Sequence, residues 1–170
     1  MTTTMNRLPV STWNPLGVNY APASAALPTV PADGWAKAEI LSPALPAGVT
    51  APAEADFTDF AASGMGAEAD AWLAENANLV NHLAVSGTAD APVVFETALD
   101  ADHPHALTCL TIDAAEGSSL TVVQVVRGDA VDGVSANLTR IRAAEHSHVT
   151  LVQVQLLGNR ACRWNAVAIE

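Results

Sequence analysis

Histidines at alternate positions are the residues in this sequence best suited to chemistry. One residue separates His146 from His148, and Pro104 separates His103 from His105. Side chains at i and i+2 of a strand project from one face, so either pair could offer two nitrogen ligands to a transition metal. Two ligands do not complete a site, and Pro104 marks a turn. The four histidines are therefore weak metal candidates, and polar residues at strand ends and turns are the simpler interpretation.

The two cysteines offer a second kind of chemistry. Cys162 has Arg160 and Arg163 as near neighbours, and guanidinium groups favour a thiolate, so Cys162 is a further weak candidate for metal or sulfur chemistry. Cys109 lies inside an apolar strand pattern, where a thiol stays protonated and inert. The pair forms no C-x-x-C motif and predicts no disulfide framework. We expect both to be small buried residues of strands.

Motifs for catalysis or nucleotide binding are missing from the sequence. No serine lies in G-x-S-x-G, and neither a glycine-rich phosphate loop nor G-K-[ST] occurs. We therefore expect no catalytic residues and no enzymatic activity, and the sequence does not indicate which residues would hold a cofactor. Any ATP chemistry would belong to a partner protein.

Charge and hydropathy narrow the class of protein further. The chain has 170 residues and a formal net charge of -11, so it lacks the basic surface with which proteins bind nucleic acids or anionic membranes. Half of its residues are hydrophobic and only 15% are charged, which favours folding over disorder. No run of about 18 apolar residues occurs, and the first ten residues lack the pattern of a secretory leader. We expect a cytoplasmic protein.

Three regions follow one another along the chain. Residues 1–62 are rich in proline and alanine and predict an extended arm, because proline disfavours helix interiors and extends the residue before it. Residues 63–78 predict an amphipathic helix, in which Met65, Ala69, Trp72 and Leu73 share one face. Residues 79–170 predict strands without an intervening helix.

The strand region favours a sandwich or a β-solenoid. Two segments, 120–126 and 149–155, carry the same pattern of alternating apolar residues with interspersed glutamines. In a solenoid the inward side chains of one coil stack on those of the next coil. We expect the core to contain Val122, Val125, Ile141, Leu151, Val154 and Val167.

Five segments, in order along the chain, carry a family resemblance. They are Asn6–Asn19, Met65–Asn78, Ala91–Thr97, Asn137–Arg142 and Val149–Leu157. Together they resemble the SufB/SufD family of iron–sulfur cluster assembly proteins, and its SufD-like branch in particular. The similarity covers most of the chain, and its specificity comes from the order of several modest matches.

The resemblance implies a fold and a role. The fold is a mainly β, right-handed parallel β-helix, preceded by the Pro-rich arm and one or two short helices. The role is that of a non-catalytic scaffold subunit, which pairs with a SufB-like subunit and a SufC-like ATPase. An iron–sulfur cluster belongs to the full complex, and no cofactor is expected on this segment alone.

One departure limits what the resemblance carries over. Family members continue for more coils, and their assigned cysteines and histidines lie in that further part, so no site residue is transferred. We expect residues 79–170 to form a β-helix truncated at its C-terminal end. A β-helix that ends at Ile169 would expose a strand edge, so we expect self-association or a partner there.

Two other functions remain open from the sequence. One is a cupin-like metal-binding β protein that uses the histidines as a cluster. The other is a free-standing structural β-solenoid outside the cell, which the absence of a leader pattern disfavours.

Overall fold

Strands make up most of the protein, as its β-branched clusters predicted. The computed structural model describes residues 33–36, 38–42, 44–53, 67–128 and 132–170. The elements in chain order are β1 (Ala38–Ile40), β2 (Val49–Thr50), α1 (Ala67–Asn76), β3 (Leu79–Val85), β4 (Val93–Ala98), β5 (His105–Ala114), β6 (Ser119–Gly128), β7 (Val134–Ala143), β8 (His148–Leu157) and β9 (Cys162–Ile169).

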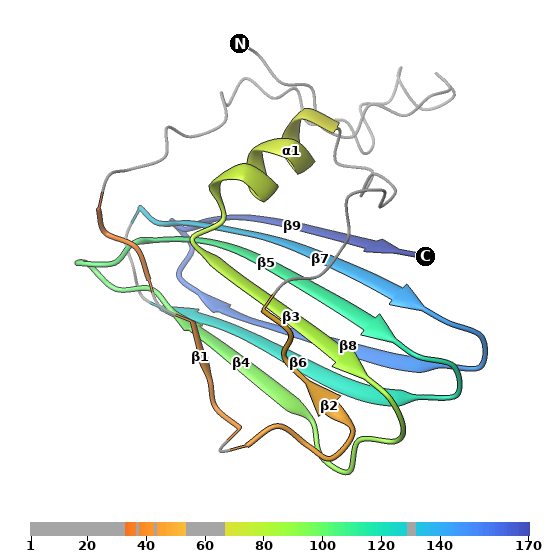
Figure 1. Cartoon of the computed structure of the whole chain (residues 1–170). Coiled ribbons are helices and arrows are strands. Elements are labelled where there is room, and N and C mark those ends of the chain that lie inside the picture. Colours follow the sequence, from red (N-terminus) through yellow and green to blue (C-terminus); the bar gives the residue numbers. More distant parts are fainter. Residues whose placement is uncertain (1–32, 37, 43, 54–66, 129–131) are drawn as a thin grey trace, which may run out of the picture.

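From β3 onward the chain alternates between two sheets and forms a parallel β-solenoid (Figure 1). The first sheet has the order β2-β3-β5-β7-β9, and the second has the order β1-β4-β6-β8. Leu79 pairs with Thr108 and Val93 pairs with Val122, a repeat of 29 residues in each sheet, whereas Val134 pairs with Cys162, a repeat of 28. The prediction of a mainly β protein with a parallel β-helix is confirmed.

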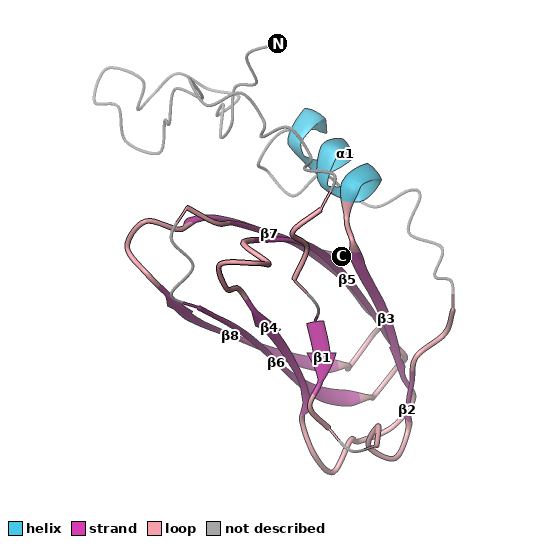
Figure 2. Cartoon of the chain, turned by 90° about the vertical axis from the view of Figure 1, so that its left-hand side faces the viewer, coloured by secondary structure: helices cyan, strands magenta, loops and turns pink. Residues whose placement is uncertain are grey.

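Two short strands cover the N-terminal edges of the sheets. β1 pairs with β4 and β2 pairs with β3, both antiparallel (Figure 2). β1 pairs with three residues of β4, and β2 pairs with only Ala84 and Val85 of β3, so each covers part of the edge of the first coil. They come from the region predicted as an extended arm, of which residues 1–32 and 54–66 lie outside the described part of the chain.

The main apolar core lies between the two sheets. Leu83, Ile112 and Ile141 occupy one position in successive coils of the first sheet, and each is at most 3% exposed. Val93 and Val122 are register partners on neighbouring strands of the second sheet, and both are fully buried. Each such side chain contributes about 1.5–3 kcal/mol relative to an exposed one, so the stacked rows hold the coils together.

The helix α1 packs on the outer face of the first sheet. Leu73 is fully buried and lies in one apolar cluster with Leu107 and Leu138. The Trp72 ring packs against the Trp164 ring, with centroids 6.0 Å apart. α1 lies within the predicted range of residues 63–78. Trp72 and Leu73, the described members of its predicted apolar face, pack against the first sheet. The side chains of Met65 and Ala69 lie outside the described residues.

Four of the six predicted core residues pack inward, namely Val122, Ile141, Leu151 and Val167. The prediction was wrong for Val125 and Val154. Their neighbours Gln124 and Gln153 occupy the inward positions, and adjacent residues of a strand alternate between faces. Both faces of β6 carry valines, so apolar alternation alone could not tell which face was inside.

Candidate functional site

The structure separates the two histidine pairs that the sequence singled out. His103 and His105 lie at the turn from β4 to β5, whereas His146 and His148 lie at the turn from β7 to β8. β5 and β7 are parallel neighbours. His103 and His105 lie where these two strands begin, whereas His146 and His148 lie just after the end of β7. Ten residues of strand put roughly 30 Å between the two turns.

The cupin-like alternative therefore loses its structural basis. Its four histidines do not form one cluster, and the described residues contain no group of three or more His, Cys, Asp or Glu that could hold a metal. A cupin is also a double-sheet antiparallel jelly roll, whereas the coils of this protein pair in parallel.

Two of the histidines contact carboxylate groups within turns. The Nδ1 atom of His103 lies 3.1 Å from Oδ1 of Asp100, and the backbone N–H of His103 donates to the same oxygen at 2.7 Å. That backbone hydrogen bond is the main cause that lowers the pKa of the Asp100 carboxyl. His146 has a positive φ of 59° and lies 3.3 Å from a carboxylate oxygen of Glu145. These contacts shape exposed turns.

The other two histidines lie at strand starts. The His105 ring packs edge-on against Trp35, with centroids 6.3 Å apart. The exposed His148 ring has Nε2 3.4 Å from the hydroxyl of Thr150. Both arrangements fit the interpretation of polar residues at strand ends.

The two cysteines differ in environment. Cys109 is buried under α1, and this burial raises the pKa of its thiol, opposed by the nearby charge of Arg140. Cys162 is exposed at the start of β9, so the expectation of two buried cysteines was right for Cys109 and wrong for Cys162. Both cysteines are free thiols. Arg160, which precedes Cys162 by two residues, is exposed as well.

Four side-chain amides meet between the sheets, and we call them the amide cluster: Gln124, Asn137, Gln153 and Asn165. The Nε2 atom of Gln153 donates to Gln124 at 2.8 Å and to Asn165 at 2.9 Å, and Asn165 donates back to Gln153 at 2.8 Å. Asn137 donates to Asn165 at 3.0 Å. These bonds tie the two sheets together and join successive coils.

Two threonines complete the hydrogen bonding of the amide cluster. The Thr108 hydroxyl donates to Oδ1 of Asn137 at 2.7 Å, and Asn137 donates to the Thr139 hydroxyl at 3.0 Å. Gln124, Asn137 and Thr139 are all buried. Buried polar groups that are fully hydrogen-bonded favour a single packing of the core. The amide cluster can recognise donors and acceptors, but it has no acid, base or nucleophile.

One pair of facing inward rows becomes more polar from the first coil to the last. One inward row of the first sheet consists of Leu79, Thr108, Asn137 and Asn165. The row that faces it on the second sheet consists of Phe95, Gln124 and Gln153. These polar rows were not predicted, although glutamine recurs at positions 124 and 153, one coil apart, in the sequence.

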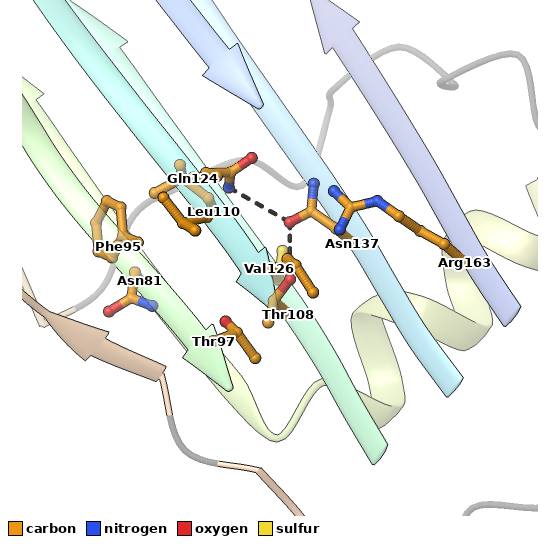
Figure 3. Close-up of a pocket in the computed structure, with 11 residues that line it drawn as sticks. Asn81, Phe95, Thr97, Thr108, Leu110, Gln124, Val126, Asn137 and Arg163 are labelled. Carbon is orange, nitrogen blue, oxygen red and sulfur yellow. Dashed lines mark hydrogen bonds between the residues drawn. The ribbon is translucent and has the colours of Figure 1, made fainter. Parts of the chain in front are cut away.

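A cavity of about 20 Å³ adjoins the amide cluster. Thr97, Thr108, Asn137 and Arg163 are among the residues that line it, and Figure 3 shows the Arg163 guanidinium beside the Asn137 amide. The NH1 atom of Arg163 is buried without a hydrogen-bond partner among the described residues, and burial lowers the pKa of this guanidinium. Arginine stays protonated in proteins, so the cavity has a positively charged wall.

The C-terminal end of the solenoid presents one free edge on each sheet within the described chain. β8 pairs only with β6, and β9 pairs only with β7. Backbone N–H groups of Cys162 and Glu170 donate to the β7 side. Successive N–H groups of a strand point to opposite sides. The N–H groups of the odd-numbered residues between Cys162 and Glu170 therefore point to the free edge of β9. Ile169 is 67% exposed at this edge.

Comparison with known proteins found no match among family models, curated proteins or solved structures. In the part of the chain that the structure describes, no helix has the length and hydrophobicity needed to cross a membrane.

Proposed function

We propose that this chain is a SufD-like, non-catalytic scaffold subunit of a Suf-type iron–sulfur cluster assembly complex, working in the cytoplasm. It joins its partners through the C-terminal end of the β-solenoid. The observation that supports the proposal is the parallel β-solenoid, together with the outer edges of β8 and β9, which no other strand of the described residues covers. The sequence resemblance supplies the identity of the partners, a SufB-like subunit and a SufC-like ATPase.

The chemistry of this end suits another solenoid as a partner. Gln153 and Asn165 form a reciprocal amide pair at the last coil, and Asn165 is exposed. A partner strand with amide or hydroxyl side chains at the same level would extend the hydrogen bonding that the amide cluster already makes. Its backbone would pair with the free N–H and C=O groups of β8 or β9.

Apolar contact adds to these hydrogen bonds. Ile169 continues the inward row of Ile112 and Ile141, and it is 67% exposed. Covering such a side chain contributes about 1.5–3 kcal/mol to association. The net charge of -11 opposes random aggregation, so we expect association of defined stoichiometry rather than precipitation. In this proposal iron and sulfide are cargo of the complete complex, and this chain alone binds no cluster.

Sedimentation velocity of the full chain tests the proposed interface. We expect the wild type to form a dimer whose population rises with concentration, because its free edges can pair with a second copy. Ile169→Lys introduces a charge at the edge and shifts the population to monomer. Val80→Lys is the matched control, because Val80 is 52% exposed on β3, at the other end of the same sheet.

The control variant should associate like the wild type, and far-UV circular dichroism verifies that both variants fold. A wild type that remains monomeric at high concentration, or equal association of the two variants, would contradict an interface at the C-terminal end.

A further inference from the structure

We propose that the cavity beside Arg163 binds a small monovalent anion, with chloride as the physiological ion. This inference is independent of the scaffold proposal, because it concerns the interior of the solenoid rather than its partners.

The position of Arg163 in β9 directs its side chain into the solenoid. Its register partner on β7 is Ser135, which is 2% exposed, and Ser135 in turn pairs with the buried Ala106 on β5. These three residues form one inward row. Figure 3 shows the Arg163 side chain reaching from β9 to Asn137, so its charge lies at the wall of the cavity.

No protein group satisfies this charge among the described residues. No carboxylate of the described residues lies within 4.0 Å of Arg163, whereas Arg127, on the surface, pairs with Glu96. The side-chain oxygen Oδ1 of Asn137 already accepts hydrogen bonds from Thr108 and Gln124. Arg163 is half-buried, and its buried NH1 atom has neither a hydrogen-bond partner nor a counter-charge among the described residues, so a bound anion would supply both.

The surroundings of the cavity define the class of ligand. Its volume of about 20 Å³ exceeds the 10–15 Å³ that one water molecule needs, so a small ion fits it. The Thr97 hydroxyl also lines the cavity, and none of the hydrogen bonds in the described chain involves it. A spherical ion with one negative charge matches a cavity with a guanidinium and a hydroxyl donor on its wall.

Thermal unfolding at constant ionic strength tests this site. The full chain is unfolded in sodium gluconate that is replaced stepwise by sodium chloride up to 300 mM. We expect the midpoint to rise by about 2–5 °C, because a ligand that binds only the folded state stabilises it. Arg163→Met should abolish the rise. Arg160→Met is the matched control, since Arg160 is exposed and three residues away, and it should keep the rise.

A second variant supplies the missing charge from within the protein. Ser135→Asp places a carboxylate on the inward row next to Arg163, so we expect a folded protein whose midpoint no longer depends on chloride. It also keeps the test valid if Arg163→Met does not fold. Crystals of the wild type soaked in sodium bromide should show an anomalous peak beside NH1 of Arg163. An equal chloride response in Arg163→Met or Ser135→Asp, or no anomalous peak at this position, would overturn the proposal.

Discussion

Replacement of Gly128 by alanine tests how closely the coils stack. Gly128 ends β6 with a φ of 150°, next to Leu99 at the end of the strand below. A Cβ atom at this position would lie 2.1 Å from the carbonyl oxygen of Leu99 and 2.9 Å from its carbonyl carbon. These are backbone atoms, so no side-chain rotation can relieve the contact. The two coils would have to move apart locally.

The expected cost has two parts. A positive φ costs an alanine about 1–2 kcal/mol, and overpacking against a rigid neighbour costs about 1–3 kcal/mol. Gly128→Ala should therefore lower the free energy of unfolding by about 2–5 kcal/mol. Gly117→Ala is the matched control, because Gly117 has a φ of 67° but no atom within 4 Å of the added Cβ. Its cost should stay near 1–2 kcal/mol.

Urea unfolding followed by circular dichroism and tryptophan fluorescence measures both variants. The m value should not change, because the surface exposed on unfolding is the same. If the two substitutions cost the same within about 0.5 kcal/mol, the close stacking of β6 on the strand below is refuted.

Three further predictions concern the interior. Asn137→Ala leaves several buried partners unsatisfied and should cost about 2–4 kcal/mol in urea unfolding, whereas Gln155→Ala, at an exposed position of β8, should cost less than about 0.5 kcal/mol. Leu73→Ala should cost about 2–5 kcal/mol and Leu156→Ala almost nothing, because Leu73 is fully buried and Leu156 is 60% exposed; equal costs would contradict the docking of α1. Burial raises the pKa of the Cys109 thiol in the folded protein, so the thiol ionises at a lower pH in the unfolded chain. The free energy of unfolding should therefore fall as pH rises above about 8.5. Cys109→Ala should remove this part of the pH dependence.

The sequence predicted the fold class well because several signals agreed. β-branched clusters without intervening helices predicted strands, and the recurring pattern of 120–126 and 149–155 was compatible with a sandwich or with stacked coils. The family resemblance then favoured the β-helix. The helix was predicted from apolar spacing, and Trp72 and Leu73 do face the sheet. These signals are local, so a single sequence contains them.

The candidate site could not be predicted in the same way. The inward or outward direction of a residue in β6 depends on the opposite sheet, and valines occur on both of its faces. Gln124 and Asn137 hydrogen-bond to each other only when the two sheets meet, so their inward direction depends on contacts between the sheets. The exposure of Cys162 likewise depends on its place at the edge of a sheet. Each of these properties comes from contacts distant in the chain.

Co-sedimentation with a SufB-like subunit tests the central proposal most directly. The full chain and that subunit are mixed at equal concentration, and the complex is resolved by sedimentation velocity. We predict a 1:1 complex that Ile169→Lys weakens at least tenfold and Val80→Lys leaves unchanged. Separate sedimentation of the two wild-type proteins over the whole concentration range would contradict the assignment of this chain as a SufD-like scaffold.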